Sequence, residues 1–156
     1  MAWHLALLLL VPWHESQGKV TGAHAAVRFV AALNAGDVAK MMAASASPFL
    51  YRNQKWKTAD GGSGFVLGAA EDQRRKTARQ RRELFEHLAK TTKIQSPQPA
   101  ERPPAQKVLL QEQLKGADTG WSQLELFVFL RGFGDVEHIA LVGVDRKGKV
   151  KALYLN

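Results

Sequence analysis

The sequence contains no cysteine among its 156 residues. This absence excludes disulfides, thiolate metal sites and a cysteine nucleophile. Histidine is present, but His24 and His87 lie far apart and show no metal-ligand spacing. The sequence therefore predicts neither a metal site nor a cofactor.

The apolar run near the N-terminus is short. Leu5–Val11 is seven residues long, whereas a membrane-spanning helix needs about 20. Pro12 follows, and then Ser16 and Gly18 at the spacing of a signal peptidase site. Residues 1–18 thus predict a signal peptide, with one exported domain, periplasmic or secreted, in residues 19–156. No Lys or Arg precedes the run, which leaves an uncleaved anchor or a cytoplasmic N-terminus open.

Acidic residues are fewer than basic ones. The chain has 14 Asp and Glu against 22 Lys and Arg, a formal net charge of +8, and its 46% hydrophobic content is that of a globular domain. Such a positive field attracts nucleic acid, anionic lipid, acidic polysaccharide or a small anion. Composition does not choose among these partners.

The first half of the chain predicts mainly helices. Ala25–Leu33 has apolar residues at helical spacing, with Gly36 placed for a left-handed cap and Asp37 placed to cap a second short helix. That helix carries Val38, Met41 and Met42 on its inner side and ends by Pro48.

The middle of the chain predicts a strand, a turn and a long helix. Phe49–Lys57 is expected as a strand, Asp60–Gly64 as a flexible turn and Phe65–Leu67 as a brief apolar element. Ala70–Thr92 is expected as the longest helix, and the proline-rich Ser96–Pro104 as an extended surface linker.

The last part of the chain predicts a sheet that ends in two consecutive hairpins. Along the longest of its strands, one face carries Glu125, Phe127 and Phe129 and the other carries Leu126 and Val128. Because both faces are apolar, helices should cover one of them and the other should curl over a second apolar volume. The four strands are expected at Lys107–Leu114, Trp121–Arg131, Val136–Asp145 and Lys149–Leu155.

Two stretches carry a family resemblance. They are Val27–Val38, with its Asn-Ala-Gly-Asp break, and His138–Val150, with its Asp-Arg-Lys-Gly-Lys turn; the Pro48-Phe49 strand entry adds to them. Together they resemble the nuclear transport factor 2-like superfamily, which includes ketosteroid isomerases and SnoaL-like cyclases. The resemblance implies an α+β fold in which N-terminal helices pack on a strongly curved, mainly antiparallel sheet that forms a conical pocket. It also implies dimerisation through the sheet.

The isomerases of this superfamily use a carboxylate base on the first strand. From Val38 to Ala59 this chain has no Asp or Glu, so we expect a protein without catalysis that binds a small or anionic ligand, or an accessory module. The alternative is an isomerase, cyclase or dehydratase that uses Tyr51, Glu125 and His138 for proton transfer.

Ligand-binding residues are predicted in the cone and at its mouth. Arg74 and Arg81 fall on the inward stripe of the expected helix, where each would either extend along apolar surface or reach a buried acid or an anionic ligand at the mouth. Arg75, Arg79 and Arg82 form a separate outward group and predict, as a third reading, a polyanion site. No aromatic residue interrupts the basic run, which makes nucleic acid an unlikely partner. Inside the cone the expected ligand contacts are Tyr51, Asn53, Trp56, Phe127 and Phe129.

Overall fold

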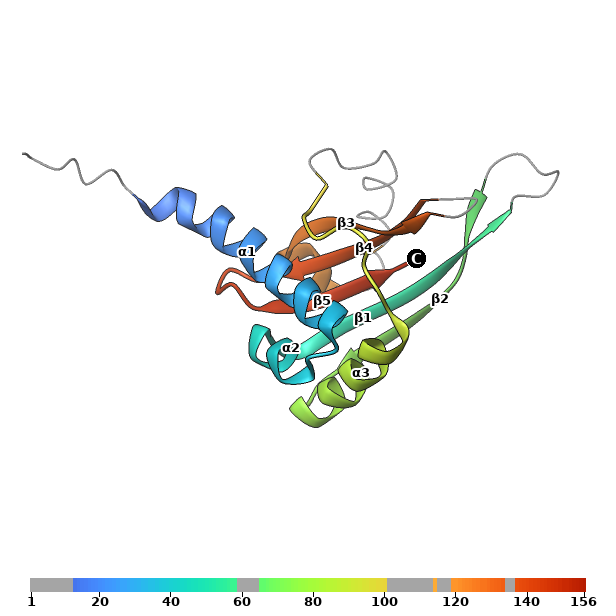
Figure 1. Ribbon diagram of the computed structural model, residues 1–156, viewed down its shortest axis with the longest axis horizontal. Coiled ribbons are helices and arrows are strands. Elements are labelled where there is room, and N and C mark those ends of the chain that lie inside the picture. The colour runs from blue at the N-terminus through green and yellow to red at the C-terminus, as the bar shows by residue number, and fades with distance from the viewer. Residues whose placement is uncertain (1–12, 59–64, 101–113, 115–118, 134–136) are drawn as a thin grey trace, which may run out of the picture.

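The computed structural model describes residues 13–58, 65–100, 114, 119–133 and 137–156, and shows three helices packed on a five-stranded mixed sheet (Figure 1). This confirms the predicted α+β class. The sheet is not strongly curled or closed, so the expected cone is not observed. The elements are α1 (Trp13–Ala35), α2 (Val38–Ala44), β1 (Ser45–Thr58), β2 (Phe65–Arg75), α3 (Ala78–Thr91), the 3-10 turn η1 (Thr119–Gln123), β3 (Glu125–Phe133), β4 (Glu137–Val144) and β5 (Val150–Leu155).

The corner between α1 and α2 has the predicted caps. Gly36 has φ +68°, a conformation that glycine adopts without a Cβ clash. The Asp37 side chain then accepts a hydrogen bond from the Lys40 amide at 3.1 Å and caps α2. These two residues turn the chain so that both helices lie over the same face of the sheet (Figure 1).

The strands of the sheet lie in the order β2-β1-β5-β4-β3. Only the β1–β5 pair is parallel among these neighbours, and the other three pairs are antiparallel. The mainly antiparallel sheet and the final hairpins are thus confirmed. Pro48 lies inside β1, where the pairing with β5 shifts between Ser45 and Leu50, and this irregularity accommodates a residue without an amide hydrogen.

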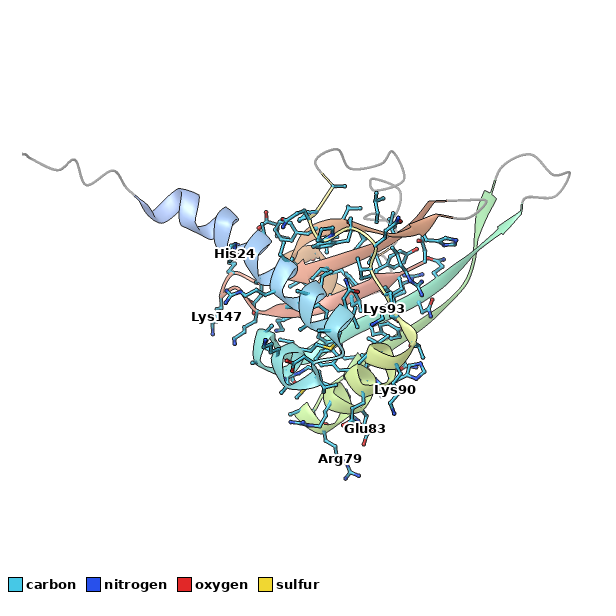
Figure 2. All side chains as sticks on the ribbon, viewed as in Figure 1. His24, Arg79, Glu83, Lys90, Lys93 and Lys147 are labelled. Carbon is cyan, nitrogen blue, oxygen red and sulfur yellow. The ribbon has the colours of Figure 1, made fainter. Side chains whose placement is uncertain are left out.

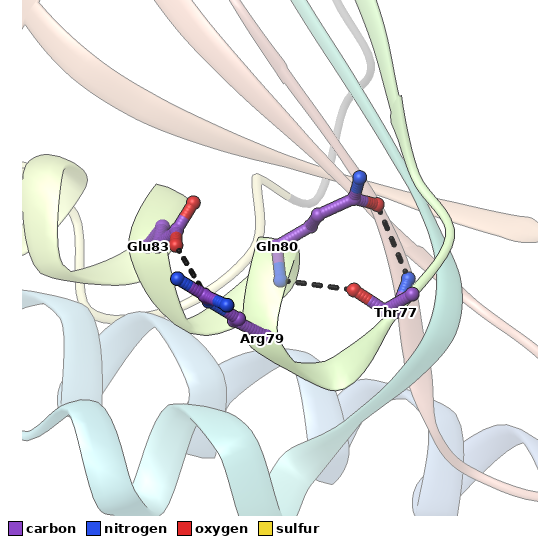
Figure 3. A network of polar contacts seen from close by, with 4 residues as sticks. All are labelled: Thr77, Arg79, Gln80 and Glu83. Carbon is purple, nitrogen blue, oxygen red and sulfur yellow. Dashed lines mark hydrogen bonds and ion pairs between the residues drawn. The ribbon is translucent and has the colours of Figure 1, made fainter.

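The predicted helix over Ala70–Thr92 is wrong in its first part. Residues up to Arg75 continue β2, because β2 pairs along β1 as far as the Phe49–Arg75 register. Strand pairing here outweighs the helical preference of the local sequence. The helix begins only after Thr77, whose hydroxyl accepts from the Gln80 amide while the Gln80 side chain accepts from the Thr77 amide (Figure 3).

The space between the helices and the sheet is filled by an apolar core. Phe29, Phe49 and Phe85 are fully buried and pack against one another, with ring centroids 5.1–6.2 Å apart. Phe129 and Val142 extend this core along β3 and β4. Close-packed side chains therefore occupy the volume in which a conical pocket was expected.

The opposite face of the sheet carries a second apolar cluster. Trp121 from η1 and Leu114 pack on it and are buried. The predicted two-sided apolar alternation is confirmed, but its cause is a sheet covered on both faces rather than a curled sheet. The buried members are Leu50, Leu114, Trp121, Val128, Ile139, Leu141, Ala152 and Tyr154.

The start of the proline-rich segment covers the β3 edge of the sheet. The amides of Ser96 and Ala100 donate to the carbonyl oxygens of Leu130 and Val128 at 3.0 and 2.8 Å, and the Leu130 amide donates to the Ser96 hydroxyl. An exposed edge strand invites unwanted pairing, and this segment protects β3 from it. The chain bends at Pro97 and Gln98, so the expected extended conformation is not observed throughout Ser96–Ala100, and the remainder of the segment lies outside the described residues.

Several sequence predictions stay untested. The turn at residues 60–64 and nearly all of the strand expected at Lys107–Leu114 lie outside the described residues. Residues 1–12 do as well, and export and dimerisation remain predictions. None of the described helices combines the length and the apolar character that a membrane span requires.

Candidate functional site

A groove of about 800 Å³ lies on the sheet face opposite the helices. Four chain segments meet there: the beginning of β1, the end of β2, η1 and the turn between β4 and β5. Its volume is within the range of ligand-binding pockets, about 300–1,000 Å³. The lining residues are Pro48, Leu50, Arg74, Gly120, Ser122, Gln123, Leu124, Asp145, Arg146, Lys147 and Lys151.

The β4–β5 turn positions one rim of the groove. The Asp145 carboxylate accepts hydrogen bonds from the amides of Lys147 and Lys149, both at 2.9 Å, and Gly148 has φ +78°. These contacts hold the turn in one shape, and Lys147 projects from its tip (Figure 2). Because the Asp145 carboxylate accepts from backbone amides, it fixes the backbone positions of the basic residues Lys147 and Lys149.

A bulge in β5 brings Lys151 to the groove. In the pairing with β4, Val144 faces Val150 and Gly143 faces Ala152, so the ladder passes over Lys151. A bulge redirects the side chain of the extra residue. Here the half-buried Lys151 joins the groove lining.

The groove combines a basic rim with an apolar floor. Among the described residues, four cations line it, namely Arg74, Arg146, Lys147 and Lys151, together with one carboxylate, that of Asp145. Pro48, Leu50 and Leu124 add an apolar surface to the lining. This arrangement suits an anionic head group attached to an apolar body.

A second cavity of about 650 Å³ lies between α1, α2 and the β4–β5 turn. Its floor consists largely of alanines, and its cations are partly engaged: Lys40 pairs with Asp37 at 3.8 Å, and the Lys149 ammonium donates to the Ala43 carbonyl at 2.8 Å. Its described lining has three cations and one carboxylate, against four cations and one carboxylate in the first groove, so it is the weaker candidate for an anion.

The structure does not bring the predicted catalytic residues together. Tyr51 is buried in the helix-facing core, and Glu125 is exposed. Glu125 faces Val144 across the β3–β4 pair, whereas His138 faces Gly132 near its other end. Six residues of strand separate His138 from Val144, about 20 Å at the usual rise. We see no shared proton-transfer site among these three residues.

The predicted pocket residues divide between the core and its edge. Phe129 is fully buried in the core, and Phe127 is half-buried and packs against it. Asn53 is half-buried on β1, and the side chain of Trp56 lies outside the described part. Phe129 and Tyr51 thus pack in the core. Together with Asn53 and Phe127, they do not line an open pocket among the described residues.

The five predicted arginines occupy different surroundings. Arg74 and Arg75 lie on β2 instead of a helix; Arg74 reaches the outer groove, whereas Arg75 is half-buried and donates to Gln73. Arg79 and Arg82 are exposed on α3, where Arg79 pairs with Glu83 at 3.3 Å (Figures 2 and 3). Of the predicted outward group, Arg79 and Arg82 thus lie on α3, and Arg75 lies on the preceding strand β2.

Arg81 faces inward, as its position on the helix predicts. It is 8% exposed, and its Nη1 donates to the Ser47 hydroxyl at 2.6 Å. Burial lowers the pKa of the Arg81 guanidinium below its ordinary value, because the charged form loses its hydration.

Three groove residues were missed by sequence reasoning: Arg146, Lys147 and Lys151. Their signal was the density of cations around the Asp145 turn, which predicts a tight turn but does not indicate which side chains face a groove. The β5 bulge that places Lys151 depends on pairing with β4 and has no local signature.

The outer face of the sheet also contains a buried tyrosine with a shifted pKa. Tyr154 is fully buried, and its hydroxyl donates to the Gln54 side chain at 3.2 Å. Burial raises the pKa of Tyr154 to about 12, and the nearby Arg52 charge opposes this shift.

We expect the stability to fall at alkaline pH because of Tyr154. The unfolded phenol ionises near its ordinary pKa of 10.0, whereas the folded one stays neutral up to about 12. The contribution of Tyr154 is therefore fully present below pH 10 and is lost as the pH rises to 12, by about 2 kcal/mol. Urea unfolding of wild type and Tyr154→Phe at pH 9, 10, 11 and 12 measures this loss. Parallel pH profiles for the two proteins would contradict it.

A scan against protein-family models gave no match, and a search among curated proteins gave none either. Within the described ranges, His, Asp and Glu side chains form no group of three or more that could hold a metal ion. The assignment of a function to this chain therefore depends on the geometry of its described residues.

Proposed function

We propose that this protein is a nuclear transport factor 2-like domain that binds an anionic ligand without catalysing a reaction. The order of its elements, in which two helices precede a long hairpin and a third helix precedes three antiparallel strands, supports the family. The ligand site lies in the basic groove on the outer face of the sheet and not in a conical interior.

The observation that carries this proposal is the charge of the groove, whose described lining has four cations and one carboxylate that is engaged with backbone amides. Charge-assisted hydrogen bonds from such cations stabilise a bound anion by about 1.5–3 kcal/mol each. The apolar contacts of Pro48, Leu50 and Leu124 would hold the non-ionic part of the ligand, at about 0.8 kcal/mol per buried methylene.

A pair of matched amphiphiles tests the proposal. Octyl phosphate and octyl glucoside have the same tail, but only the phosphate has an anionic head. In calorimetric titrations below micelle formation, we expect octyl phosphate to bind at least about tenfold more tightly, a difference of about 1.4 kcal/mol. Its affinity should also fall as the salt concentration rises. Equal affinities for the two compounds, or no binding, would refute the proposed function.

The separation of Tyr51, Glu125 and His138 disfavours the alternative enzyme. A polyanion site on α3 receives less support than the groove, since Arg79 is paired with Glu83 and Arg75 lies on β2.

A further inference from the structure

Arg81 is a buried cation with little compensation. It lies in the second turn of α3 and donates to a neutral acceptor, the hydroxyl of Ser47. Its Nε is buried without a hydrogen-bond partner among the described residues, and no described carboxylate pairs with its guanidinium. An uncompensated buried charge costs several kcal/mol, so an arginine in this position favours the binding of an anion.

A second arginine lies on the same side of the sheet. Arg75 pairs across the ladder with Phe49, two residues beyond Ser47 on β1. Phe49 packs on Phe85, which follows Arg81 by one helical turn. Arg75 and Arg81 therefore flank the same short segment of β1, one from β2 and one from α3. The Nε of Arg75 is also buried without a partner among the described residues.

We propose that Arg81, Arg75 and Ser47 form a binding site for a phosphate group. Two guanidiniums match the double negative charge of phosphate, and each has further N–H donors besides the one that contacts Ser47 or Gln73. The Ser47 hydroxyl, which accepts a hydrogen bond from Arg81 Nη1 at 2.6 Å, can donate its own hydrogen to a phosphate oxygen. Ser47 and Arg75 are half-buried, so the site has access to solvent.

This site is separate from the outer groove and does not depend on the proposed function. Arg74 and Arg75 are adjacent on β2, but successive strand residues point to opposite faces. Arg74 lines the groove, whereas Arg75 lies opposite the core residue Phe49. Variants of one site should therefore leave the other intact.

Thermal unfolding at constant ionic strength tests the site with two probes, inorganic phosphate and ethyl phosphate, and with acetate as the comparison anion. At a concentration of about one hundred times Kd, phosphate should raise Tm by about 5–10 °C. Acetate at the same ionic strength should have a smaller effect. The larger of the two phosphate responses identifies whether a free phosphate or a phosphate ester fits.

Four variants separate this site from nonspecific charge effects and from the outer groove. Arg81→Met should abolish the rise in Tm, and Arg79→Met, an exposed position on the same helix, should retain it. If Arg81→Met does not fold, Ser47→Ala provides a second test. We expect the Ser47→Ala variant to bind phosphate about tenfold or more weakly than wild type. The groove variant Arg146→Glu/Lys151→Glu should behave as wild type. No rise in wild-type Tm, or an undiminished rise in Arg81→Met or Ser47→Ala, would overturn the proposal.

Discussion

Phe85→Ala is expected to lower the free energy of unfolding by about 3–5 kcal/mol. Phe85 is fully buried, and its ring makes edge contacts with Phe29 and Phe49, at centroid distances of 5.5 and 5.1 Å. Its removal would leave a void between α3 and the sheet, since the two neighbouring rings are held on α1 and β1 and cannot both move into the space. Urea unfolding followed by circular dichroism measures the loss.

The same substitution tests whether the space between helices and sheet is filled. If this space were an open ligand pocket, Phe85 would line a cavity, and its truncation would change stability by well under 2 kcal/mol. His87→Ala is the matched control, because His87 is exposed on the same helix and its truncation should be close to neutral. Equal stabilities of the two variants would contradict the filled core.

Charge reversal at the outer groove is expected to weaken the binding of octyl phosphate at the groove. In Arg146→Glu/Lys151→Glu, two cations of the rim become anions, and each lost charge-assisted hydrogen bond costs about 1.5–3 kcal/mol. The affinity should therefore fall at least about hundredfold, with additional loss from repulsion. Both side chains lie outside the two buried apolar clusters, so stability should change little.

Arg79→Glu/Arg82→Glu provides the control for the charge reversal. It makes the same change in net charge on α3, which packs on the other face of the sheet. A general effect of net charge would weaken binding in both double variants to the same extent. The groove proposal requires the loss to be confined to Arg146→Glu/Lys151→Glu.

Local signals in the sequence predicted much of the fold. The Gly36-Asp37 corner and the Asp145 turn use residues whose backbone preference is strong and local, and both lie where the sequence placed them. The alternation along residues 124–130 also identified the two faces of β3. Each of these features depends on a few neighbouring residues.

The errors concern features that depend on distant residues. The segment from Ala70 to Arg75 has helix-forming residues, but its pairing with β1 makes it a strand. That change removed Arg74 from the expected inward stripe and placed it in the outer groove. Similarly, apolar residues on both faces of β3 indicated a covered sheet, but they did not reveal that Trp121 and Leu114 supply the second cover.

We propose that the ligand binds on the outer face of the sheet. Amide chemical shifts during titration with octyl phosphate test it most directly, since they report the position of binding residue by residue. We expect the largest changes at Leu124, Arg146 and Lys151 and small ones at Phe85 and Phe129. Changes concentrated at Tyr51, Phe85 and Phe129, with none at the groove, would show binding between the helices and the sheet and would contradict this account.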